Sequence, residues 1–237
     1  MDRIVLSLCD YTGNMVRPWL EAGYECWIVD TRHEPGEHRD GHLVRVGADV
    51  RDWLPPRLNY VIAFAFPPCT HMAVSRARWF RGKGLRALSE AIDVFGACVH
   101  RCQWTGAPWL VENPVSVIAS HFRRPDHTFD PCDYGDPWTK KTCLWTGCGF
   151  VMPPKRRVEP TLGSKMVRMP PSPERGNLRS ETPIGFARAV FDANCPTSSD
   201  SPSRPDEPGW QPGETPRTGE SAIATCRMGR RGAGDLV

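Results

Sequence analysis

The stretch Arg3-Ile-Val-Leu-Ser-Leu-Cys-Asp-Tyr-Thr-Gly-Asn14 decides the fold that this sequence predicts. Its first half is a continuous apolar run as long as a buried strand, and its second half is rich in turn-forming residues. Residues 15–22 then have a helical pattern, which Gly23 ends. A buried strand, a tight turn and a helix in this order are typical of the start of a nucleotide-binding α/β fold.

Further apolar runs continue this pattern along the chain. Additional strands are predicted at residues 25–30, 42–46, 60–66, 108–111 and 141–145. Residues 85–104 have apolar side chains at helical spacing, and residues 182–194 are predicted as a last helix with Pro183 at its start. The alternation predicts an α/β fold with a mostly parallel sheet and flanking helices.

Length and composition predict one folded domain, residues 1–194, and a disordered tail, residues 195–237. The chain of 237 residues is long enough for a single core, whereas its end is dominated by Pro, Ser, Gly and Glu. Lys and Arg total 30 against 27 acidic residues, for a net charge of +3. This balance permits nucleic-acid binding but does not indicate a dedicated basic binder.

The cysteines and the start of the chain favour a reduced, cytoplasmic protein without a membrane partner. Ten cysteines occur in a chain far longer than small secreted disulfide scaffolds. The first apolar run is too short for a signal peptide or a membrane span. Neither Cys98 with Cys102 nor Cys143 with Cys148 has the usual zinc-ligand spacing, so we expect no metal site.

A thiol and a carboxylate follow two of the predicted strands. Pro67-Pro68-Cys69-Thr70 closes the run at residues 60–66, and Glu112-Asn113-Pro114 closes the run at residues 108–111. Ligands bind at the carboxyl ends of parallel strands, so Cys69 as nucleophile and Glu112 as general acid could face one substrate. Taken singly, a cysteine is more often a buried apolar residue, and the acidic tripeptide could be an ordinary strand end.

A nucleophilic thiol needs neighbours that favour its thiolate, and the local candidates are His71, Arg76 and Arg78. Six residues separate Cys69 from Arg76, which does not fit the Cys-x5-Arg loop of thiol phosphatases. At the other strand ends, Asp30 could accept hydrogen bonds from ribose hydroxyls. It could equally cap a helix, just as Asp49 could be a solvated loop acid.

The order of these pieces resembles the DNA (cytosine-5) methyltransferase family, in particular its short phage-type members, over about residues 3–194. The quoted turn is similar to the motif that binds S-adenosylmethionine. Tyr134-Gly-Asp-Pro-Trp-Thr-Lys-Lys-Thr142 is similar to a later Tyr-Gly-x-Pro-Gln-x-Arg-x-Arg segment, and residues 179–186 lie where the final motif is expected. The resemblance implies cofactor contacts by Asp10, Tyr11, Gly13, Asp30, Asp49, Pro67 and Thr182. It implies catalytic roles for Cys69, Glu112, Asn113 and Lys140.

The implied protein has a Rossmann-like S-adenosylmethionine-dependent fold, acts as a monomer on DNA and methylates carbon 5 of an extruded cytosine. Cys69 would add to ring carbon 6 while Glu112 contacts ring nitrogen 3. Asn113 would orient the nucleophile loop, and Lys140 would steady the base or its phosphate.

Three departures from the family pattern stand out. Only Gly13 remains of the Gly-x-Gly-Gly motif, and Lys140 replaces an arginine. The region left for target recognition, about residues 150–178, is short, so we expect a short or relaxed target sequence. Its basic residues could contact phosphates or simply be solvated: Lys155, Arg156, Arg157, Lys165 and Arg168. A catalytically impaired DNA-binding or decoy protein is the alternative function, and RNA or free nucleotides remain possible substrates.

Overall fold

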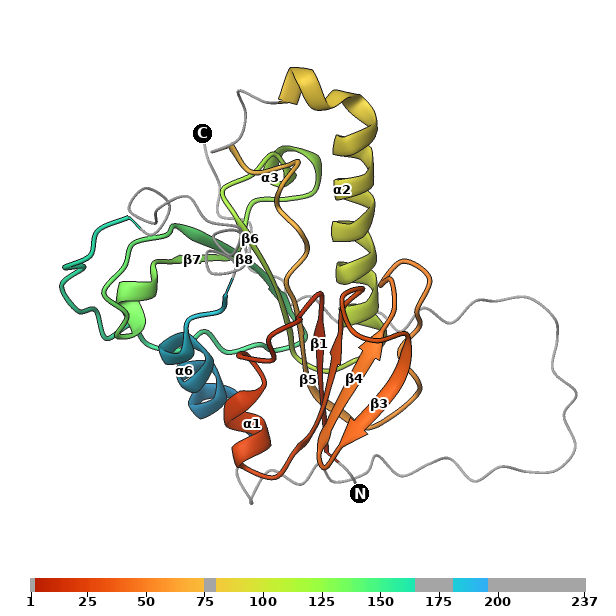
Figure 1. Cartoon of the computed structure of the whole chain (residues 1–237). Coiled ribbons are helices and arrows are strands. Elements are labelled where there is room, and N and C mark those ends of the chain that lie inside the picture. Colours follow the sequence, from red (N-terminus) through yellow and green to blue (C-terminus); the bar gives the residue numbers. More distant parts are fainter. Residues whose placement is uncertain (1–2, 75–79, 165–180, 196–237) are drawn as a thin grey trace, which may run out of the picture. The chain divides into compact units, whose positions relative to one another are not determined.

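A single mixed sheet of eight strands organises the described residues of the computed structural model, which are residues 3–74, 80–164 and 181–195. The strand order is β3-β4-β2-β1-β5-β6-β8-β7. The strands are β1 (Ile4–Leu8), β2 (Glu25–Val29), β3 (Gly36–Asp40), β4 (Leu43–Gly47), β5 (Tyr60–Ala65), β6 (Trp109–Pro114), β7 (His127–Phe129) and β8 (Thr142–Gly147). The helices are α1 (Arg17–Glu21), α2 (Phe80–Trp104), α3 (Ile118–His121), the 3₁₀ helix η2 (Pro131–Tyr134) and α6 (Ile184–Asn194). The α/β class is therefore confirmed (Figure 1).

The five central strands β4, β2, β1, β5 and β6 are parallel, whereas pairs at both edges are antiparallel. The chain leaves β1 through α1 to reach β2 on one side, and it later returns to place β5 on the other side. Successive connections therefore run in opposite directions from β1. In open α/β sheets, a crevice for ligands forms at the carboxyl ends of the strands at such a point.

Helices cover both faces of the sheet, and the alternation of β1 shows how. Ile4, Leu6 and Leu8 pack in the same core as the buried face of α2, whereas Val5 packs in the core formed by α1 and α6. Figure 1 shows α2 on one face and α1 with α6 on the other. An uninterrupted apolar run is the pattern of a strand that is buried on both faces.

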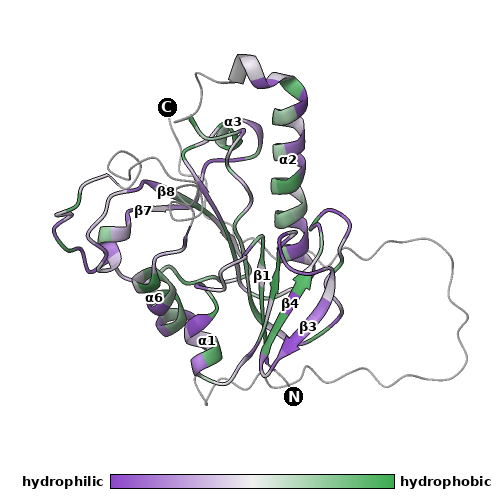
Figure 2. Ribbon diagram, in the orientation of Figure 1, coloured by the Kyte–Doolittle hydropathy of each residue, from purple (hydrophilic) through white to green (hydrophobic). Residues whose placement is uncertain are grey.

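Several elements differ from the sequence prediction. Strand β3 was not predicted because its five residues are all exposed, and Figure 2 shows it as hydrophilic. It forms a hairpin with β4, so the connection from β2 to β4 carries a strand instead of a flanking helix. Strand β7 was also missed, because three residues are too few for a recognisable pattern. Helix α1 begins at Arg17, two residues later than expected.

Other boundaries have simple causes. The helix predicted at residues 85–104 lies within α2, in which Gly84 adopts a non-helical φ of 75° and ψ of 173°. Strand β6 continues through Glu112 to Pro114 because β8 pairs with it over that length. Within the predicted recognition region, residues 150–164 contain no helix or strand, and residues 165–178 lie outside the described residues. The predicted tail lies outside them from residue 196 onward.

Candidate functional site

A cavity of about 1050 Å³ lies at the carboxyl ends of the central strands. It brings together most of the residues that the sequence singled out: Asp10, Tyr11, Asp30, Asp49, Pro67, Cys69, Glu112, Lys140 and Thr182. Of the other two, Gly13 shapes the turn after β1 and Asn113 is fully buried behind the cavity wall. The residues that follow β1, β2, β4 and β5 line the cavity, together with the end of β6 and the residues that lead into β8.

Cys69 and Glu112 come from the neighbouring parallel strands β5 and β6. Ala65 pairs with Val111 in the register of these strands, so Glu112 lies one residue beyond the last paired position. Cys69 begins a tight turn, in which its carbonyl accepts hydrogen bonds from the backbone N–H groups of Met72 and Ala73 at 3.1 and 2.9 Å. The thiol and the carboxylate thus line one cavity, as the strand-end argument predicts.

Three hydrogen bonds join the segment around Cys69 to the segment around Glu112. The side-chain amide of Asn113 donates to the carbonyl of Pro67 at 3.1 Å. The backbone N–H of Val74 donates to the carbonyl of Val115 at 3.0 Å, and that of Val117 donates to Met72 at 3.2 Å. These contacts fix the position of one segment relative to the other.

Lys140 approaches Glu112 from the start of β8. Its Nζ lies 3.7 Å from Oε1 of Glu112, and the two side chains are only 14% and 16% exposed. The backbone N–H of Lys140 donates to Asp130 at 2.8 Å, which fixes this part of the chain. An ammonium group and a carboxylate therefore meet inside the cavity next to the strand that leads to Cys69.

The turn after β1 is organised by the buried carboxylate of Asp10. It accepts hydrogen bonds from the backbone N–H of Gly13 at 2.8 Å, from Ser7 at 2.8 Å and from Thr12 at 3.2 Å. Burial raises the pKa of Asp10, and these hydrogen bonds act in the opposite direction. Gly13 has a φ of 69°, in the left-handed region that glycine adopts without strain. Asp10 thus shapes the turn whose backbone borders the cavity.

The predicted ribose acid, Asp30, is held by Arg32 two residues further on. Its Oδ1 accepts from the backbone N–H and from Nε of Arg32, both at 2.9 Å, and its Oδ2 accepts from Nη2 at 3.1 Å. The guanidinium also lies 4.3 Å from the centre of the Tyr11 ring. That ring stacks on His33 with a centroid distance of 5.2 Å.

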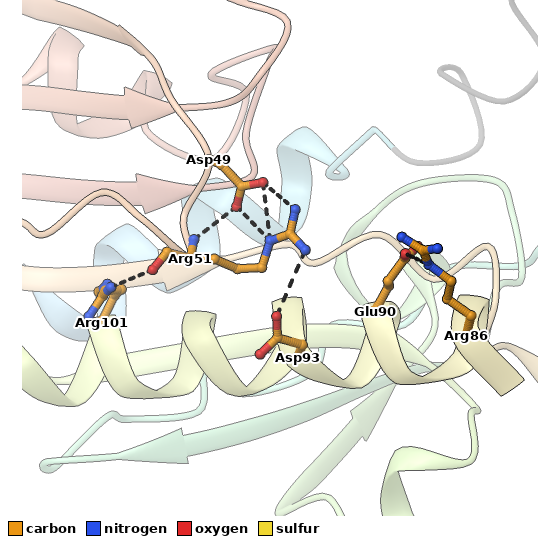
Figure 3. Close-up of polar contacts among 6 residues, drawn as sticks. All are labelled: Asp49, Arg51, Arg86, Glu90, Asp93 and Arg101. Atoms are coloured by element: carbon orange, nitrogen blue, oxygen red, sulfur yellow. Dashed lines mark hydrogen bonds and ion pairs between the residues drawn. The ribbon is translucent and has the colours of Figure 1, made fainter.

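Asp49 has the same arrangement with Arg51, as Figure 3 shows. The hydrogen bond from Arg51 is the main reason that the pKa of Asp49 is lowered. Arg51 also lies 3.8 Å from Asp93 of α2, and its carbonyl accepts from Arg101 at 2.8 Å. The Asp49 loop is therefore tied to α2.

Two basic residues of the predicted recognition region form ion pairs within the protein. Lys155 and Arg157 both contact Asp133, at 2.8 and 2.6 Å. Burial alone would raise the pKa of Asp133, but hydrogen bonds from Lys155, from the backbone of Asp130 and from Arg157 hold it below its usual value. These two side chains therefore anchor the loop, although about half of each remains exposed.

Several predicted residues lie outside the described part of the chain: Arg76, Arg78, Lys165 and Arg168. His71, the remaining candidate for activating Cys69, is half-buried, and its Nδ1 has no hydrogen-bond partner among the described residues.

Four residues that the sequence analysis did not select belong to this site. Arg32, Lys141 and Glu181 line the cavity, and Arg51 fixes Asp49 beside it. The repeated Asp-x-Arg at residues 30–32 and 49–51, each directly after a strand or one residue beyond it, was the available signal for the arginines.

Comparisons with known proteins add no relative: no family model matches the chain, and no curated protein matches it significantly. Among the described residues, no helix is both long and apolar enough to span a membrane. The same part of the chain contains no group of three or more His, Cys, Asp or Glu side chains that could hold a metal ion.

Proposed function

We propose that this chain is an S-adenosylmethionine-dependent DNA (cytosine-5) methyltransferase with a Rossmann-like fold. One observation carries the proposal: Cys69 and Glu112, from adjacent parallel strands, line the same cavity as Asp10, Asp30 and Asp49, which follow β1, β2 and β4 of the same sheet. A nucleophile and an acid thus share a cavity with a set of nucleoside-binding candidates, which is what transfer between a bound cofactor and a pyrimidine ring requires.

The residues at the ends of β1, β2 and β4 fit the proposed cofactor. Asp30 has carboxylate oxygens that suit ribose hydroxyls, the half-exposed ring of Tyr11 forms part of the wall, and the left-handed turn at Gly13 brings backbone to the cavity wall. Asp49, Pro67 and Thr182 complete this part of the wall. S-adenosylmethionine, when bound there, supplies an electrophilic methyl group.

The protein's own residues then activate the cytosine. The thiolate of Cys69 adds to ring carbon 6, and Glu112 protonates or hydrogen-bonds ring nitrogen 3, so that carbon 5 becomes nucleophilic. Once carbon 5 carries the methyl group, loss of its proton and departure of the Cys69 sulfur restore the aromatic ring. Asn113 holds the Pro67 carbonyl and thereby the loop that aims the thiol. Lys140 orients Glu112 or steadies the base.

The proposed partner is DNA, whose cytosine ring must become accessible to the cavity. A cytosine inside a duplex must leave the stack at a cost of a few kcal/mol before a cavity at a sheet edge can receive it. The described part of the recognition region, residues 150–164, offers Arg156 and the exposed halves of Lys155 and Arg157 for phosphate contacts. A recognition region this short suits a target of about two to four base pairs, because each base contact needs its own side chain.

A methyl-transfer assay tests this proposal. Wild type, C69A and the control C195A, whose thiol lies outside the cavity at the end of α6, are incubated with DNA and a labelled methyl donor. We expect 5-methylcytosine from wild type and C195A, and at least a thousandfold less from C69A. Equal incorporation by C69A would show that Cys69 is not the nucleophile. Donor binding without any methyl transfer by wild type would favour the impaired DNA-binding or decoy protein.

DNA that contains 5-fluorocytosine gives a second readout. After methyl transfer, fluorine cannot leave carbon 5 as a proton does, so the Cys69 adduct cannot break down. We expect a covalent protein–DNA complex that survives denaturing electrophoresis for wild type and C195A and is missing for C69A. A complex that forms with C69A would place the covalent bond on another residue.

A further inference from the structure

The contact between Arg32 and Asp30 occupies the acceptor atoms that a ribose would need. Both oxygens of the Asp30 carboxylate accept hydrogen bonds from Arg32, at 2.9 Å for Oδ1 and 3.1 Å for Oδ2. Asp30 is only 9% exposed, so few directions of approach to these oxygens remain. A pair of ribose hydroxyls that donates to both oxygens competes directly with the guanidinium.

The Arg32 side chain lies where a ligand that enters the cavity could displace it from Asp30. It lines the cavity, is 48% exposed and rests on the ring of Tyr11, which is itself half-exposed. Arg51 holds Asp49 in a similar way but does not line the cavity.

We propose that Arg32 is a latch on Asp30, which the adenosine part of the cofactor displaces when it binds. This inference rests on the proposed function, because it takes Asp30 as the acid for the cofactor ribose. Binding exchanges the Arg32–Asp30 ion pair for hydroxyl–Asp30 hydrogen bonds, and the freed guanidinium stays next to the Tyr11 ring. Affinity is lower than the cavity alone would give, because every binding event must first open the ion pair.

A simpler explanation must be separated from the latch. S-adenosylmethionine carries a net positive charge, so an arginine in its cavity weakens binding by repulsion even if the arginine never moves. S-adenosylhomocysteine has the same adenosine but no sulfonium, and its net charge at neutral pH is zero. A latch affects both ligands by the same factor, whereas repulsion affects only the charged one and fades in high salt.

Titration calorimetry with both ligands tests the latch in R32A and R32Q. The glutamine variant keeps most of the side chain over Tyr11, in case R32A folds poorly. The control is R39A, which removes the same charge from the exposed strand β3, where Arg39 pairs with Glu25 at the opposite end of β2. We expect both Arg32 variants to bind both ligands roughly two- to fivefold more tightly, the factor for freeing one partly exposed ion pair. R39A should bind as wild type does.

Each other outcome overturns the latch. Tighter binding of S-adenosylmethionine alone would show repulsion, and unchanged or weaker binding of both ligands would show that Arg32 is inert or holds the ligand itself. If neither wild type nor the Arg32 variants bind either ligand, the proposed function fails as well. If wild type binds both and only the effect of Arg32 is missing, the proposed function stands and the latch alone is wrong.

Discussion

Replacing Asn113 tests whether a buried amide holds the nucleophile loop against β6. Asn113 has no exposed surface, and its Nδ2 donates to the Pro67 carbonyl at 3.1 Å. Its Oδ1 is buried and has no partner among the described residues. One net hydrogen bond contributes about 1 kcal/mol, and an unpaired buried polar atom costs about 1–3 kcal/mol. N113A removes both the hydrogen bond and the unpaired Oδ1, but it leaves the Pro67 carbonyl without this donor and a small cavity beside it. We expect the free energy of unfolding to fall by about 1–2 kcal/mol.

N113D has nearly the same shape as Asn113, but it turns the hydrogen bond to Pro67 into a repulsive contact. It replaces the donor with a carboxylate oxygen that faces the Pro67 carbonyl, and it buries a charge without a described partner. The expected loss of unfolding free energy is about 3–5 kcal/mol, the cost of an uncompensated buried charge. Urea unfolding followed by circular dichroism at pH 7 measures both variants. If N113D were as stable as N113A, the hydrogen bond to Pro67 would not hold the loop.

N113A also separates stability from function. N113A should remain folded and yet transfer methyl groups about 10–100-fold more slowly, because a nucleophile that is misplaced by about 1 Å costs a factor of that order. The measurement is kcat under conditions in which N113A is fully folded. An unchanged kcat would mean that the Cys69 loop keeps its position without Asn113.

The remaining predictions concern the pair at Glu112, the anchored loop and the turn after β1. K140A should lower kcat about 10–100-fold, measured by labelled methyl transfer, because the ammonium group 3.7 Å from Glu112 no longer orients that side chain. A K140A enzyme as fast as wild type would exclude Lys140 from the mechanism. Asp133 has a lowered pKa in the folded chain, so the unfolded chain binds the proton first. The stability advantage of wild type over D133N should therefore be fully present at pH 7 and shrink below about pH 4 in urea unfolding; a constant difference down to pH 3 would contradict this assignment. G13A should cost about 1–2 kcal/mol through its φ of 69°, as should G23A with a φ of 83°. Only G13A should also weaken cofactor binding in calorimetry, and equal binding by the two variants would separate the Gly13 turn from the cofactor.

The central strands could be predicted because a strand that is buried on both faces has a continuous run of apolar residues. Every residue of β1 is buried, and the runs of β2 and β5 are nearly as apolar. Strand β3 could not be predicted in the same way, because its side chains are exposed and only its pairing with β4 makes it a strand. The length of β6 likewise depends on its partner β8, which no local pattern of β6 reveals.

The residues of the cavity wall were predictable, but their contacts with one another were not. Strand ends and motif order alone point to Cys69, Glu112 and Asp30. That Glu112 meets Lys140 depends on the antiparallel register of β6 and β8, and that Asp30 is occupied by Arg32 depends on a side-chain conformation. Spacing along the chain carries neither kind of information.

The short ladder between residues 72–74 and 115–117 also affects how this protein could be engineered. Because each segment supplies backbone partners to the other, a graft of the Cys69 segment alone from another scaffold would bring in carbonyls and N–H groups with no counterpart. The two segments form one exchangeable cassette, to be transplanted or randomised together. A library that varies only one of them would select mostly for repair of the ladder and would rarely sample new chemistry.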